Sequence, residues 1–158
     1  MKRTTITLCA LLAGLGAAQA ETVAPTSVAF EEGAVALSLT GVAGDPVEGA
    51  KVVSTKSQGN CVACHEITDQ ADVPFLGEVG PILDGAGDRW SEAELRGILV
   101  DAKMTFDESM MPSFYKTEGF IRLGKAYTGK AAEGPLDPLL SAQQIEDVVA
   151  FLMTLKEE

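Results

Sequence analysis

The chain has 158 residues, of which 46% are hydrophobic, 22% charged and 6% aromatic. This composition is typical of one soluble domain with room for an extension, and it excludes a disordered, collagen-like or repetitive chain. The formal net charge of −11 argues against nucleic-acid binding, because a polyanion would be repelled.

The first 20 residues have the pattern of a secretory signal peptide. Lys2 and Arg3 precede an apolar run over residues 5–18, and residues 18–20 (Ala-Gln-Ala) form a small-x-small cleavage site. The run of about 14 residues is shorter than the about 20 that span a bilayer, so we expect cleavage and periplasmic export rather than an uncleaved anchor. Cleavage would remove Cys9 and two basic residues, leaving 138 residues, two cysteines, a net charge of −13 and no membrane span.

The two remaining cysteines lie in a Cys-x-x-Cys-His motif. Cys61, Cys64 and His65 match the attachment motif of c-type haem, in which both thiols bind the porphyrin edge and the histidine is an axial iron ligand. A thioredoxin-like redox pair should lie in an α/β pattern, which is absent. A zinc site needs four ligands, whereas the chain has one histidine and no second cysteine pair. The motif therefore predicts one covalently attached haem c, with no histidine left for a catalytic dyad.

A methionine is the predicted ligand on the opposite side of the iron. Met111 lies 46 residues beyond His65 and directly precedes Pro112, which disfavours the α conformation and places the thioether on a loop. Met110 is the alternative, whereas Met153 lies in a helical pattern typical of a core methionine. Coordination by His65 and Met111 would raise the reduction potential and suit electron transfer.

Three helices are predicted. The first covers about residues 46–56, with Asp45 as its N-cap and Gly49 permitting close approach to another helix. The second begins after Ser91 and the third after Ser141, and each has a capping-box residue three positions later. The apolar stripes of the second and third helices are Leu95, Ile98, Leu99 and Ala102, and Ile145, Val148, Val149 and Leu152.

The segments between these helices are loop-like. Residues 66–80 are acidic and irregular, and residues 124–138 are rich in glycine and proline. Residues 21–44 form an N-terminal extension that could wrap the body or a partner. Within it, Val35, Leu37 and Leu39 alternate like a short strand with nothing obvious to pair with.

The order of these features over residues 46–157 resembles class I cytochrome c. The resemblance implies an all-α class I cytochrome c fold with crossing terminal helices that meet at Gly49. It also implies that the Pro81 carbonyl accepts a hydrogen bond from His65 and so fixes the imidazole ring. We therefore divide the chain into a signal peptide (1–20), an N-terminal extension (21–44) and a c-type cytochrome domain (45–158).

Residues 110–115, 119–122 and 139–152 are similar to the SoxX family, the monohaem subunits of the SoxAX cytochromes of bacterial sulfur oxidation. This resemblance implies a heterodimer with a SoxA-like haem-bearing catalytic subunit. The complex would be an L-cysteine S-thiosulfotransferase that conjugates thiosulfate to a cysteine of the SoxYZ carrier protein. The present chain would accept the released electrons and pass them to a soluble cytochrome c, without catalytic residues of its own.

Two other functions fit the motif. A free periplasmic electron shuttle would dock transiently on basic partners through the charge of the mature chain. A haem sensor or peroxidase-like enzyme would need an open iron coordination position, and no second histidine is present to act as acid or base.

Overall fold

The computed structural model describes residues 21–120 and 134–157, which form four α-helices and several short 3₁₀ turns. The helices are α1 (Pro46–Ser54), α2 (Ala86–Arg89), α3 (Glu92–Asp101) and α4 (Ala142–Leu152). Within the described residues the only β-type pairing is an isolated bridge, so the predicted all-α fold is confirmed. None of the described helices is long and apolar enough to span a membrane.

Helices α1 and α4 cross at a glycine. Asp45 caps α1 as predicted, because its carboxylate accepts hydrogen bonds from the first backbone amides of the helix. A Cβ atom on Gly49 would overlap the backbone carbonyl of Asp147 and approach the side chain of Phe151. The close approach of two helices therefore requires a residue without a side chain at this point, as the sequence predicted. Helix α1 ends two residues earlier than expected.

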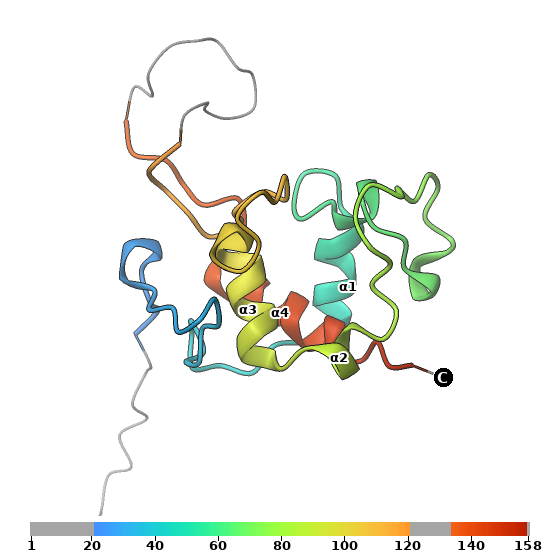
Figure 1. The fold of residues 1–158 in the computed structure, drawn as a ribbon, viewed down its shortest axis with the longest axis horizontal. Helices are drawn as coiled ribbons and strands as arrows, with labels where there is room; N and C mark the ends of the chain where they lie inside the picture. Colours follow the sequence, from blue (N-terminus) through green and yellow to red (C-terminus); the bar gives the residue numbers. More distant parts are fainter. Residues whose placement is uncertain (1–20, 121–133, 158) are drawn as a thin grey trace, which may run out of the picture.

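Helices α3 and α4 both begin at the predicted capping boxes. In each, the serine side chain accepts a hydrogen bond from the third helical amide, and the third side chain bonds back to the serine amide. The predicted stripe of α4 is buried throughout. Of the stripe predicted for α3, Leu95 and Leu99 are buried and Ile98 is half-buried, while Ala102 is buried in the 3₁₀ turn that follows the helix. Figure 1 shows α4 between α1 and α3, and it packs against both.

The N-terminal extension wraps the helical body. Val35 and Leu39 are buried, but Leu37 between them is 77% exposed, so the alternation predicted the right two contacts and the wrong secondary structure. The backbone hydrogen bonds of this segment go to other parts of the fold instead of to a strand. The Val35 amide donates to the Ala93 carbonyl, and the Leu39 amide donates to the carboxylate of Glu146.

The connection between α1 and α3 contains one helix that the sequence did not predict. Helix α2 follows Gly85, whose φ of +71° favours glycine, and it lies against the C-terminal end of the chain. The amide of Gly87 donates to the carbonyl of Leu155, and Lys156 donates back to the Gly87 carbonyl. Residues 66–80 are irregular apart from a 3₁₀ turn, as predicted. The predicted signal peptide and most of the loop at 124–138 lie outside the described residues.

Candidate haem-binding site

The Cys-x-x-Cys-His segment forms one tight turn after α1. Asn60 has a φ of +49°, and a 3₁₀ turn over Cys61–Ala63 follows it. The backbone amides of Cys64 and His65 both donate to the Cys61 carbonyl, at 3.0 and 2.9 Å. This turn places two thiols and one imidazole within five consecutive residues, on a segment that begins where α1 ends.

The imidazole of His65 is held by the loop that follows it. Its Nδ1 lies 2.7 Å from the Pro81 carbonyl oxygen. Since a carbonyl only accepts, Nδ1 carries the proton, and Nε2 is left as the nitrogen that can bind a metal. Gly80 packs against the ring so closely that a Cβ atom there would overlap three ring atoms, and its amide donates to the Cys64 carbonyl at 2.7 Å.

The two cysteines lie in different surroundings. Cys64 is exposed, whereas Cys61 packs against the hydrophobic core. Burial raises the pKa of the Cys61 thiol to about 11. The raised pKa keeps Cys61 in the thiol form, whereas the attacking cysteine of a redox-active pair is a thiolate. Among the described residues, no group of three or more metal-binding side chains forms a zinc-type cluster.

The methionines differ in burial. Met111 is half-buried and packs against the core, whereas Met110 directs its side chain outward and is 81% exposed. Met104 is 51% exposed, and Met153 packs against the core at the end of α4, as expected of a core methionine. Of the two neighbouring methionines, Met111 is therefore the more buried.

These residues fit a covalently attached haem. The segment after α1 supplies two thiols and an imidazole with one free nitrogen, and the segment after α3 supplies a half-buried thioether. Several apolar side chains that pack against the core remain partly exposed, as expected of residues that also cover an apolar ligand. They are Val73, Leu76, Leu83 and Trp90.

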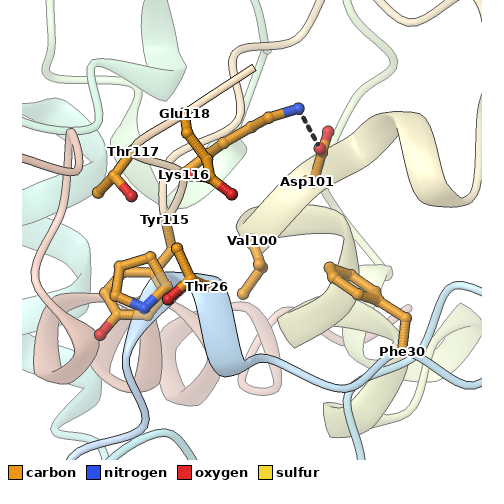
Figure 2. Close-up of a pocket in the computed structure, with 9 residues that line it drawn as sticks. Thr26, Phe30, Val100, Asp101, Tyr115, Lys116, Thr117 and Glu118 are labelled. Atoms are coloured by element: carbon orange, nitrogen blue, oxygen red, sulfur yellow. Dashed lines mark hydrogen bonds and ion pairs between the residues drawn. The ribbon is translucent and has the colours of Figure 1, made fainter. Parts of the chain in front are cut away.

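Sequence reasoning missed the contact between Gly80 and His65, although the position of Gly80 directly before Pro81 was a usable signal. It also missed a cluster of polar side chains around Asp101. Figure 2 shows two members of this cluster, Asp101 and Lys116, beside a pocket of about 220 Å³, which is lined by the extension, the end of α3 and residues 115–118. The pocket contains none of the predicted haem-binding residues, and its charged pair, Asp101 and Lys116, is already bonded.

Comparisons with known proteins show which proteins the chain resembles. The family model for cytochrome c matches residues 46–156. A chain of the crystal structure of SoxXA from P. pantotrophus is 58% identical, with a TM-score of 0.81, and the match covers 86% of the present chain and 99% of that chain. A search of curated proteins gave no match.

Proposed function

Because the chain belongs to the cytochrome c family and carries covalently bound haem c, we propose that it is the electron-transfer subunit of a periplasmic thiosulfate-oxidising SoxAX complex. The observation that carries this proposal is the 58% identity to a chain of SoxXA over 99% of that chain's length. The sequence-based assignment to the SoxX family is confirmed by the same match.

We assign the haem attachment to Cys61 and Cys64 and the axial positions to His65 and Met111. The Pro81 carbonyl holds the His65 ring so that Nε2 remains available, and Gly80 packs closely against the same ring. Bound haem would supply one-electron chemistry. The thioether of Met111 would serve as the second protein ligand of its iron, favouring the reduced state and raising the potential.

The proposed chemistry of sulfur transfer lies outside this chain. After removal of residues 1–20, Cys61 and Cys64 are the remaining cysteines, and both are committed to haem. No thiol of this chain is then available to accept sulfur. A SoxA-like partner would carry out the conjugation of thiosulfate to the SoxYZ carrier, and this chain would pass the electrons to a soluble cytochrome c.

The test of the proposed assembly is the native mass of the mature protein isolated from the periplasm, with haem counted per particle. We expect a heterodimer with a larger haem-bearing partner, stable at high ionic strength. A monohaem monomer at every concentration, exchanging electrons at rates that fall steeply with added salt, would instead identify a free electron shuttle.

The axial ligand is tested by two neighbouring variants. Met111→Ala should abolish the weak methionine–iron absorption at the red end of the oxidised spectrum. Met110→Ala is the matched control and should retain it, because the Met110 side chain is 81% exposed. The reverse result would move the axial position to Met110 and leave the assembly proposal untouched.

A further inference from the structure

The segment that carries Met111 is closed at its base by the carboxylate of Asp101. Asp101 ends α3 and is 9% exposed. The Ser113 hydroxyl donates to its Oδ1 at 2.7 Å, and the Lys116 ammonium lies 3.0 Å from its Oδ2. One buried side chain therefore ties the beginning of the segment to the residues that follow Met111.

The same carboxylate is connected to the Met111 backbone through Lys103. The Lys103 amide donates to Asp101 Oδ1 at 3.3 Å, and the Lys103 ammonium donates to the Met111 carbonyl at 3.0 Å. On the other side, the Met111 amide donates to the Ser109 hydroxyl at 3.2 Å. Both backbone polar groups of Met111 are thus held by side chains of its own loop.

The N-terminal extension braces this base from outside. The Tyr115 hydroxyl donates to the Val23 carbonyl at 2.7 Å. Thr26 and Phe30 of the extension face Asp101 and Tyr115 across the pocket drawn in Figure 2. The ends of the loop are therefore fixed between α3 and the extension.

We propose that Asp101 is a positioning residue that, together with Lys103, holds the Met111 thioether in place as the axial ligand. This inference rests on the proposed role of Met111. An external ligand can bind the iron at that position only when the Met111 segment has moved away. Its apparent affinity therefore reports the fraction of molecules in which the segment is open. Asp101 and Lys103 would lower that fraction.

Imidazole binding to the oxidised holoprotein measures this fraction directly. Asp101→Asn removes the charge of a buried, multiply bonded group, and we expect the apparent Kd for imidazole to fall about tenfold. Lys103→Ala removes one exposed hydrogen bond, and we expect a fall of about threefold. Asp88→Asn is the matched control. It breaks an equally short ion pair, with Lys156, at α2, and it should leave imidazole binding unchanged.

Urea unfolding of the same variants separates positioning from stability. If Asp101→Asn lowers the unfolding midpoint while imidazole binding stays at the parent value in both Asp101→Asn and Lys103→Ala, the proposal is wrong and Asp101 is purely structural. Should Asp101→Asn fail to fold, Lys103→Ala decides alone, because its side chain is exposed. Retention of the red-end absorption in Met111→Ala would overturn the ligand assignment itself, a result separable from failure of the Asp101 variants.

Discussion

Glu146 and Arg96 form a buried ion pair, and replacing Glu146 with glutamine should lower the free energy of unfolding by about 3 kcal/mol. Both side chains are 5% exposed, and three contacts of 2.9–3.2 Å join them. Breaking a buried pair from one side typically costs about 3–5 kcal/mol, because an uncompensated charge remains. We take the lower end because Glu92 lies 3.9 Å from Arg96 and partly balances its charge.

A double variant tests the reasoning behind this number. Glutamine keeps an oxygen that can accept the hydrogen bond from the Leu39 amide, so Glu146→Gln removes charge rather than the bond to the extension. Adding Arg96→Met then removes the unpaired cation. We expect the double variant to be more stable than Glu146→Gln alone, since it leaves no buried cation without a partner.

The assay is urea unfolding of the holoprotein, followed by far-ultraviolet circular dichroism. Glu48→Gln is the control, because the Glu48–Lys51 pair lies on the surface of α1 with more than half of each side chain exposed. It should leave the midpoint unchanged. A loss below about 1 kcal/mol in Glu146→Gln, or a double variant no more stable than the single one, would refute the account of the pair as a coupled buried charge.

Three further predictions concern the helix crossing, the histidine and the acid range. Gly49→Val should lower the urea midpoint strongly, because its side chain would overlap the Asp147 carbonyl and force α1 off α4. Gly80→Ala should displace the His65 ring, seen as a lowered reduction potential and an altered visible spectrum of the holoprotein. Burial would raise the pKa of the Asp101 carboxyl, but hydrogen bonds from Ser113 and Lys116 outweigh it and hold this pKa below its ordinary value. Asp101 therefore contributes stability above its unfolded pKa of about 3.9, and this is lost as the pH falls through the lower folded pKa. Urea midpoints measured between pH 6 and pH 3 should decline less in Asp101→Asn.

The first of these predictions has a control variant, and the other two have a result that would refute them. Gly134→Ala should leave the urea midpoint unchanged, because no atom of the described residues lies within 4 Å of the added atom. An unchanged spectrum in Gly80→Ala would show that the His65 ring is not constrained by the loop. Equal acid sensitivity of the parent and Asp101→Asn would show that another carboxylate dominates unfolding in this range.

The short sequence motifs predicted the helix starts, the haem-attachment turn and the helix crossing correctly. The capping boxes at Ser91 and Ser141 need only four consecutive residues, and the haem motif needs five, so their geometry is encoded within one turn of chain. The role of Gly49 at the helix crossing was also predictable, because a glycine on a helix face allows another helix to approach closely. What these signals share is that no distant residue has to be known.

Longer-range features were not predictable in the same way. The bonds of Asp101 to Ser113 and Lys116 join residues 12 and 15 positions apart, and nothing in their spacing marks them. Leu37 was expected inside a strand but lies exposed. The backbone amides of Val35 and Leu39 donate hydrogen bonds to α3 and α4, so this segment does not pair with a second strand. Period-two hydrophobicity cannot distinguish a strand from an extended segment pinned at two points.

The extension belongs to the folding unit of this chain, although the cytochrome c family model begins only at residue 46. Val35 and Leu39 are among its core residues, at 3% and 1% exposure. The Val35 carbonyl also accepts a hydrogen bond from the buried guanidinium of Arg96, and the Leu39 amide donates to Glu146. A chain beginning at residue 46 would leave these charged groups with unpaired hydrogen-bonding capacity and uncover part of α3 and α4. The part shared with the family positions the haem donors, and the added part completes the core that holds them in place.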